Sequence, residues 1–393
     1  MSAGAEAPGA LRASIVAGAR RVVVKIGSRT LAGDAAVYDR LAQAIGRART
    51  GRIARDVVIV SSGAIALGLQ VLGLKSRPKE MAKLQAAAAA GQSVLMRRYE
   101  EAFERAAAAD DGARFGRVAQ VLLTHADLAD RARANNARAA LEALLEAGVV
   151  PIINENDTVA VDEIKFGDND QLAALVAPLV SADLLVLLSD VSGLLDGEGR
   201  RVPVVRDVER EALPLVGAAP AAAIHGGAAR ESVGSGGMAS KLEAARRGSL
   251  AGAAVIIADA RAPATLDEIF AGEDVGTLVL PEPDRLGARK HWILFTLRPR
   301  GALIVDAGAV AALEDRGSSL LAVGVLGVRG AFGAGDAVQI VDASGREVAR
   351  GLAALSALDV ARIAGRRGAE VEAIVGRAVD AVVHRDDLVV VRR

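Results

Sequence analysis

Short β-branched runs alternate with helix-like stretches through the first two thirds of this 393-residue chain, and that alternation constrains the fold more than any other feature. Runs typical of buried strands occupy 22–26, 57–60, 118–123, 149–153, 184–188 and 255–258. Helical patterns lie between them, notably at 83–98, 136–147 and 172–182. Strands that alternate with helices in this way predict an α/β fold, a mainly parallel sheet with helices on both faces.

The most polar stretch of the chain, residues 154–171, falls between the strand at 149–153 and the helix at 172–182. It holds six acidic side chains and one lysine, namely Glu155, Asp157, Asp162, Glu163, Asp168, Asp170 and Lys165. Because ligands of open α/β sheets bind at the carboxyl ends of strands, this stretch predicts a site for a charged small molecule or a metal. A solvated acidic loop is the alternative that the composition leaves open. Asp168 or Asn169 can cap the following helix.

Only seven of the 48 lysine and arginine residues are lysines, so each lysine is a candidate for a specific role. Lys25, Lys165 and Lys241 lie close to glycines. A compact ammonium on a flexible stem suits a moving phosphoryl group, whereas arginine offers a planar fork. Ser62 and the pair Ser189 and Asp190 each follow a predicted strand, at the edge where a ligand would bind.

A glycine cluster at 234–241, Gly-Ser-Gly-Gly-Met-Ala-Ser-Lys, opens an amphipathic helix that runs to residue 247. It matches neither the Walker A motif nor G-x-G-x-x-G. Its glycines can still present successive backbone amides to an anion, and Lys241 adds a full charge, so the cluster predicts a phosphate site. A flexible loop before a helix is the competing interpretation.

Beyond Pro299 the pattern changes to short β-branched runs separated by glycine and aspartate turns, which predicts a small, mostly β domain. From that residue onward the chain has 12 arginines, 12 acidic residues and a single aromatic residue, Phe332. Such balance, without aromatic side chains on which bases could stack, argues against strong RNA binding.

Composition excludes several other classes. The chain has no cysteine, so disulfides, thiolate metal sites and cysteine nucleophiles are ruled out, and a cytoplasmic location fits. Residues 1–19 lack a sustained apolar core and are expected to form a loose tail rather than a signal peptide. The window 172–188 is interrupted by Pro178 and Asp183, so no transmembrane helix is expected.

Taken together, the motifs resemble the amino-acid kinase family, in its glutamate 5-kinase branch with a C-terminal PUA-like domain. The resemblance rests on Val-Lys-Ile-Gly at 24–27, Ser-Ser-Gly-Ala-Ile-Ala at 61–66, Asn-Glu-Asn-Asp at 154–157, Gly-Asp-Asn-Asp at 167–170 and Gly-Gly-Met-x-x-Lys at 236–241. It implies a kinase domain over 20–280, a linker over 281–298 and a PUA-like domain over 299–393.

By the same resemblance, Lys25 and Lys241 are the expected catalytic residues, and ATP and Mg²⁺ the expected cofactors. The expected nucleotide-binding residues are Lys25, Ser189, Asp190, Ser235, Gly236, Gly237, Met238, Ala239, Ser240 and Lys241. Glutamate is expected to meet Ser62, Asp157 and Asn169, whereas Lys165, Asp168 and Asp170 are candidates for orienting substrate or Mg²⁺. The metal ligands themselves stay unassigned. This chain has Ser235, Ala239 and Ser240 where the family's pattern has threonines or serines, so the resemblance does not carry over the hydroxyl contacts there.

The chemistry agrees with these residues. A carboxylate with a solution pKa of about 4.3 is already ionised at neutral pH, so its phosphorylation requires no general base. The resemblance further implies a homo-oligomer, feedback inhibition by proline and delivery of the product to glutamyl phosphate reductase. Two alternatives stay open: a kinase of the same fold acting on N-acetylglutamate, aspartate or a nucleoside monophosphate, and a protein that binds RNA through its PUA-like domain.

Overall fold

The computed structural model describes residues 8–109, 116–160, 169–218, 237–283 and 285–391, and divides the chain into two compact units, Met1–Arg285 and Leu286–Arg393. Among the described residues, no helix is both long and apolar enough to cross a membrane.

The first unit is built on an eight-stranded sheet in the order β3-β4-β2-β1-β5-β7-β8-β6. All neighbouring strands run parallel except β7 and β8, so the predicted mainly parallel α/β fold is confirmed. The strands are β1 (Arg21–Ile26), β2 (Asp56–Ser61), β3 (Val118–Leu123), β4 (Val150–Glu155), β5 (Leu184–Ser189), β6 (Val204–Val205), β7 (Ala254–Asp259) and β8 (Thr277–Val279).

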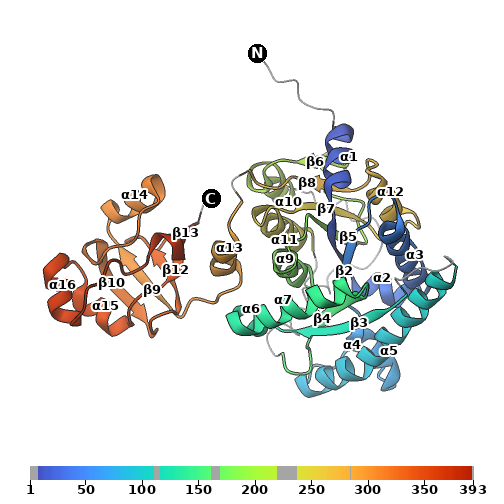
Figure 1. Ribbon diagram of the computed structural model, residues 1–393, viewed down its shortest axis with the longest axis horizontal. Helices are drawn as coiled ribbons and strands as arrows, with labels where there is room; N and C mark the ends of the chain where they lie inside the picture. The colour runs from blue at the N-terminus through green and yellow to red at the C-terminus, as the bar shows by residue number, and fades with distance from the viewer. Residues whose placement is uncertain (1–7, 110–115, 161–168, 219–236, 284, 392–393) are drawn as a thin grey trace, which may run out of the picture. The chain divides into compact units, whose positions relative to one another are not determined.

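Helices cover both faces of this sheet (Figure 1). In the described part of the unit they are α1 (Pro8–Gly18), α2 (Ser28–Gly33), α3 (Ala36–Thr50), α4 (Ala64–Val71), α5 (Met81–Ala108), α6 (His125–Ala129), α7 (Arg131–Glu146), α9 (Asn169–Leu179), α10 (Leu213–Ala218), α11 (Met238–Leu250) and α12 (Thr265–Ala271), with a π-helical turn at Val208–Ala212. Alternate strand residues such as Val24 and Ile59 pack with α1, α3, α5 and α12 in one apolar core. Helix α9 contacts β1, β2, β4 and β5, and helix α11 contacts β5, β7 and β8, and neither helix contributes a residue to that core.

The N-terminal segment differs from the loose tail that its composition suggests, because residues 8–18 form helix α1 with Arg12 and Val16 buried. The Arg12 guanidinium donates hydrogen bonds to the carbonyls of Pro203, Val275 and Gly276, which lie near the starts of β6 and β8. Asp274 pairs with the same guanidinium at 3.3 Å. These partners lie more than 190 positions away in sequence, so a local pattern could not reveal them.

The second unit holds a five-stranded sheet in the order β10-β9-β11-β12-β13, which confirms a small, mostly β domain. Its elements are α13 (Ala288–Phe295), β9 (Gly301–Val305), α14 (Ala307–Arg316), η2 (Ala322–Gly324), β10 (Val325–Gly330), β11 (Ala337–Val341), β12 (Glu347–Leu352), α15 (Ala357–Ile363), α16 (Gly368–Val375), η3 (Arg385–Asp387) and β13 (Leu388–Val390). Helix α13 lies within the stretch 281–298 that the sequence suggests is a linker. Ile293 and Leu294 of this helix pack against Val389 of β13, so α13 belongs to the second unit.

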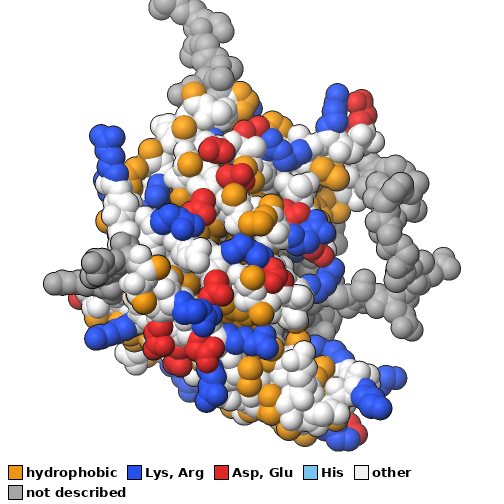
Figure 2. Space-filling view, turned by 90° about the vertical axis from the view of Figure 1, so that its right-hand side faces the viewer, with side chains coloured by type: hydrophobic (Ala, Val, Ile, Leu, Met, Phe, Trp, Pro, Cys, Tyr) orange, Lys and Arg blue, Asp and Glu red, His pale blue; other side chains and the backbone are white. Residues whose placement is uncertain are grey.

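The surface of the first unit around α3, α5 and α12 displays mixed charge (Figure 2). Lysine and arginine side chains there are interspersed with aspartate and glutamate rather than gathered in a basic stripe. Cross-helix pairs such as Arg47 with Asp267 and Arg105 with Asp39, each at 2.7 Å, join α3 to α12 and α5. This face therefore lacks the electrostatic footprint of a nucleic-acid-binding surface.

Candidate active site

Strand geometry directs Lys25 toward the start of α9. Successive side chains of a strand point to opposite faces, and Val24 and Ile26 lie in the core formed with α1, α3, α5 and α12. Lys25 lies between them in sequence and therefore points to the other face, where α9 packs on β1. Gly27 follows at the carboxyl end of the strand, and a Cβ there would lie 3.8 Å from the Lys25 ammonium nitrogen.

Asp170, in the first turn of α9, joins the two lysines that the sequence singled out as catalytic. Its Oδ1 lies 2.6 Å from Nζ of Lys25, and its Oδ2 lies 3.3 Å from Nζ of Lys241 in the first turn of α11. All three side chains are buried, with exposed fractions of 9% for Lys25, 4% for Lys241 and 1% for Asp170. Residues 25, 170 and 241, which lie on three different elements, thus form one buried cluster of charged side chains.

This arrangement gives Asp170 a defined place among the roles that the sequence left open for it. Each of its carboxylate oxygens faces one lysine, so it holds the two ammonium groups at a fixed separation. The other two residues with open roles, Lys165 and Asp168, lie outside the described residues.

Asn169 ties the cluster to the turn after β2. Its Nδ2 lies 2.7 Å from the Ser61 carbonyl oxygen, 2.8 Å from Oγ of Ser62 and 3.0 Å from Oδ1 of Asn154. The turn itself depends on Gly63, whose φ of 100° is readily adopted only by glycine. Helix α9 therefore begins with two site residues side by side, one that contacts the lysines and one that contacts the β2 turn.

The chain of side-chain amides continues from Asn169 into helix α5. Asn154 donates from Nδ2 to Oε1 of Gln92 at 2.9 Å, and its Oδ1 also accepts from the Glu155 backbone amide. Tyr99, two helical turns after Gln92, places its hydroxyl 2.9 Å from Oγ of Ser61. Burial raises the pKa of Tyr99, so this hydroxyl stays protonated.

Ser189 and Asp190, at the carboxyl end of β5, lie beside the lysine cluster. The Ser189 hydroxyl donates to Oδ1 of Asp190 at 3.1 Å, and the Arg29 guanidinium donates to Oδ2 at 2.6 Å. Burial works against ionisation of Asp190, but the charge of Arg29, the hydrogen bonds and the charge of Lys241 outweigh it, so its pKa lies below the ordinary value. Asp190 therefore carries a negative charge at neutral pH.

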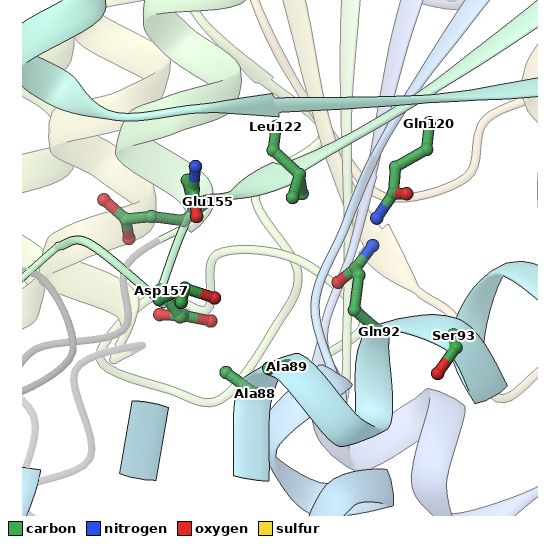
Figure 3. A pocket seen from close by; sticks show the side chains of 10 residues that line it. Ala88, Ala89, Gln92, Ser93, Gln120, Leu122, Glu155 and Asp157 are labelled. Carbon is green, nitrogen blue, oxygen red and sulfur yellow. The ribbon is translucent and has the colours of Figure 1, made fainter. Parts of the chain in front are cut away.

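A cavity of about 290 Å³ opens next to this network (Figure 3). Glu155 and Asp157 lie on one side of it, and Gln92 and Gln120 lie on the other. Asp157 is half-buried, and it is the predicted substrate residue that lines the cavity. The other two predicted substrate residues, Ser62 and Asn169, are connected to this cavity by a chain of hydrogen bonds. Ser62 bonds to Asn169, Asn169 bonds to Asn154, and Asn154 bonds to Gln92 on the cavity wall.

The glycine cluster is described only in part, because Ser235 and Gly236 lie outside the described residues. Gly237 is the N-cap of α11, and Met238, Ala239, Ser240 and Lys241 form its first turn. The Ser240 carbonyl accepts a hydrogen bond from Gln171 of α9 at 3.2 Å, so the two helices that supply Asp170 and Lys241 are joined directly. Among the described residues, no group of three potential ligands lies together that could hold a metal ion by itself.

Four residues of this network, Gln92, Tyr99, Asn154 and Arg29, were missed as site residues by sequence reasoning. Gln92 and Tyr99 lie in a helix whose alanine run, 86–90, reads as a packing surface. Close packing does occur there, since a Cβ at Gly91 would lie 1.8 Å from the Ala64 carbonyl oxygen of α4. Asn154 lies in the polar stretch and in the Asn-Glu-Asn-Asp motif, which gave a signal for that residue, whereas no local pattern distinguishes Gln92.

Comparison with known proteins matches residues 20–259 to the amino acid kinase family and residues 301–375 to the PUA domain. A protein named glutamate 5-kinase from Geobacter sulfurreducens is 46% identical over 391 residues, covering 97% of this chain and 100% of the relative. Another of that name from Myxococcus xanthus is 49% identical over 384 residues, covering 95% and 96%. A third, from Cupriavidus taiwanensis, is 46% identical over 383 residues, covering 96% and 100%.

Proposed function

This chain belongs to the amino acid kinase family, among its glutamate 5-kinases, and on that premise we propose that it transfers the γ-phosphoryl group of ATP to the side-chain carboxylate of L-glutamate. The product is L-glutamyl 5-phosphate, and the reaction opens proline biosynthesis. One observation carries the proposal at the level of chemistry: two buried lysines share one buried carboxylate at the carboxyl edge of a parallel sheet.

The charge of this cluster suits phosphoryl transfer. Lys25 and Lys241 bring two full positive charges to a buried place at the edge of the sheet where a ligand would bind. A transferring phosphoryl group, with its charge spread over three oxygens, is a suitable partner. Lys25 and Lys241 would stabilise that charge as it moves from ATP to the acceptor, and Asp170 keeps them in place.

The acceptor needs no general base. The glutamate side chain, with a solution pKa of about 4.3, is ionised at neutral pH and can attack phosphorus as it is. Ser62 would assist, because its Oγ accepts from Asn169 and its own hydroxyl hydrogen can be donated to a carboxylate oxygen. Asp157, on the wall of the cavity, would pair with the substrate ammonium.

ATP use follows from the kinase family, and Mg²⁺ is part of the proposal. Mg²⁺ would neutralise phosphate charge, and such an ion commonly needs only one or two protein carboxylates. Both oxygens of Asp170 face lysines, so a role as sole metal ligand does not suit it. Ser189, Asp190 and the first turn of α11 would contact the nucleotide. A cytoplasmic location, assembly into a homo-oligomer, feedback inhibition by proline and delivery of the acyl phosphate to a reductase go with this proposal.

Trapping with hydroxylamine tests the proposal. An acyl phosphate reacts with hydroxylamine to give a hydroxamate, whereas phosphorylation of a nucleotide gives a phosphoanhydride and no hydroxamate. With ATP and Mg²⁺, glutamate should yield hydroxamate, and aspartate should fail because it is one methylene shorter. N-acetylglutamate should fail because its neutral amide leaves Asp157 without a cation, at a cost of roughly 1 to 3 kcal/mol.

Asp157→Asn should raise KM for glutamate far more than KM for ATP, since Asp157 is an acceptor-site contact. Preference for N-acetylglutamate or aspartate would replace the substrate but keep the kinase. Absence of ATP turnover with every acceptor, together with tight RNA binding at physiological salt, would overturn the enzyme assignment.

A further inference from the structure

The side-chain amide of Gln92 has an orientation that its neighbours determine. Asn169 must present Nδ2 to the Ser61 backbone carbonyl, which can only accept. Asn154 must present Oδ1 to the Glu155 backbone amide, which can only donate. Asn154 therefore donates a hydrogen bond from Nδ2, and Oε1 of Gln92 accepts it. Backbone groups at both ends thus determine the direction of every amide in the chain.

This leaves Nε2 of Gln92 as a hydrogen-bond donor on the cavity side. Gln92 is 8% exposed, and its Nε2 has no hydrogen-bond partner among the described residues. A buried amide nitrogen without an acceptor costs roughly 1 to 3 kcal/mol. Figure 3 shows the amide nitrogens of Gln92 and Gln120 pointing toward each other at one side of the cavity, with Asp157 on the other.

Gln120 is exposed, so its amide can turn away from Gln92 and leave Nε2 of Gln92 open to a ligand. A carboxylate oxygen is a suitable acceptor for this buried donor. The opposite wall supplies the Asp157 carboxylate. The cavity thus offers donors on one side and an acceptor for a cation on the other, which matches the carboxylate and ammonium of an α-amino acid.

We propose that Nε2 of Gln92 donates to the α-carboxylate of glutamate, the carboxylate that is not phosphorylated, and thereby makes the enzyme selective for a dicarboxylic amino acid. In the chain of contacts, Asn154 and Asn169 stand between Gln92 and the Asp170 cluster. A carboxylate received by Gln92 is therefore not the one that lies at the lysines. The inference rests on the proposed function and assigns to Gln92 the α-carboxylate contact that Ser62 and backbone amides could otherwise make.

The test pairs one substitution with three ligands. Gln92→Glu keeps an oxygen for Asn154 but replaces the donor with a charge that repels a carboxylate. 4-Aminobutyrate lacks only the α-carboxylate of glutamate, and glutarate lacks only the ammonium. In Gln92→Glu, kcat/KM for glutamate should fall about 10- to 100-fold, the range for hydrogen bonds to charged groups, with most of the loss in KM. The inhibition constant of glutarate should rise in parallel, while that of 4-aminobutyrate and KM for ATP should stay within about twofold.

Two further variants guard against indirect effects. Lys83→Ala is the control on the same helix, because Lys83 pairs with Glu80 at the exposed start of α5 and does not line the cavity. Its kinetics should equal those of the wild type. Gln92→Met removes both donor and acceptor, and it should also weaken glutamate more than 4-aminobutyrate. Comparing ligands within one variant cancels any loss of folded protein.

Three outcomes would overturn the inference. Equal losses for glutamate and 4-aminobutyrate would mean that Gln92 acts only through Asn154 on the site as a whole. Unchanged constants for all three ligands would mean that Nε2 meets a water molecule and not the substrate. A fall in kcat with KM for glutamate preserved would mean a structural role. Wild-type protein that gives no hydroxamate with glutamate contradicts the proposed function instead, so the two failures are distinguishable.

Discussion

Replacing Asp170 with asparagine removes a buried negative charge that contacts both Lys25 and Lys241. The carboxylate lies 2.6 Å from one ammonium nitrogen and 3.3 Å from the other, and its own exposed fraction is 1%. Breaking a buried ion pair by removing one partner costs about 3 to 5 kcal/mol, because the other charge stays buried. At 2 to 4 °C per kcal/mol for a unit of this size, Tm should fall by roughly 10 °C.

The change in Tm on adding ATP distinguishes loss of this charge from a general loss of stability. In Asp170→Asn the site carries two positive charges with no counter-charge from Asp170, so bound ATP relieves more repulsion than in the wild type. The rise in Tm on adding ATP should therefore be larger in the variant, while kcat falls at least about 100-fold because the lysines are no longer held in place.

Thermal unfolding with and without ATP, alongside hydroxamate kinetics, measures both effects. Asp267→Asn is the matched control, since Asp267 pairs with Arg47 at 2.7 Å on the surface, with exposed fractions of 37% and 59%. Exposed pairs contribute about 0 to 1 kcal/mol, so this control should keep its Tm within a few degrees and its full kcat. Wild-type kcat and Tm in Asp170→Asn would refute the view that the carboxylate organises the lysines.

Three further predictions concern Lys241, the boundary between the two units and Asp190. Lys241→Ala should lower kcat about 100- to 1000-fold, as for other lost transition-state donors, with a normal circular dichroism spectrum; near-normal kcat would exclude Lys241 from the reaction. A chain that ends at Arg285 should fold and still produce hydroxamate, because the two units have separate cores; insoluble protein that binds no nucleotide would show that the units depend on each other. Because the pKa of Asp190 lies below its usual 3.8, the stabilising pair with Arg29 is complete above that value and is lost as pH falls through the lowered pKa. The Tm difference between wild type and Asp190→Asn should accordingly stay constant from about pH 5 to 8 and shrink below about pH 4, and a change near neutrality would contradict the assignment.

The sequence was sufficient to predict the parts of this site that follow from strand order. Lys25, Ser62 and Ser189 each follow or end a β-branched run, and the carboxyl ends of parallel strands meet at one edge. Asp170 and Lys241 open helices that return from that edge, so a common location could be expected from the alternation alone. The contact of both Lys25 and Lys241 with the Asp170 carboxylate could not be predicted, because it depends on how α9 and α11 pack.

Other features depend on contacts between distant positions. Gln92 is oriented by Asn154, 62 residues later, and no local pattern distinguishes it from a surface glutamine on a helix. Arg12 turns an expected tail into an ordered helix through carbonyls at 203, 275 and 276. Helix α13 is held by Val389 near the end of the chain, so a stretch that reads as a linker joins the second core. In each case the partner, not the local sequence, decides the structure.

In the proposed reaction the lysine cluster delivers the γ-phosphoryl group to an oxygen of the glutamate side-chain carboxylate. Glutamate labelled with ¹⁸O in that carboxylate shows whether this transfer takes place. If a carboxylate oxygen attacks phosphorus, the acyl phosphate contains it as the bridging atom. Hydroxylamine then attacks the carbonyl carbon and expels phosphate that carries one ¹⁸O, which mass spectrometry detects. We expect this label in the phosphate released by the wild type and only a trace of labelled product from Lys241→Ala. Unlabelled phosphate from the wild type would mean that water, not glutamate, receives the phosphoryl group, and would rule out the proposed transfer.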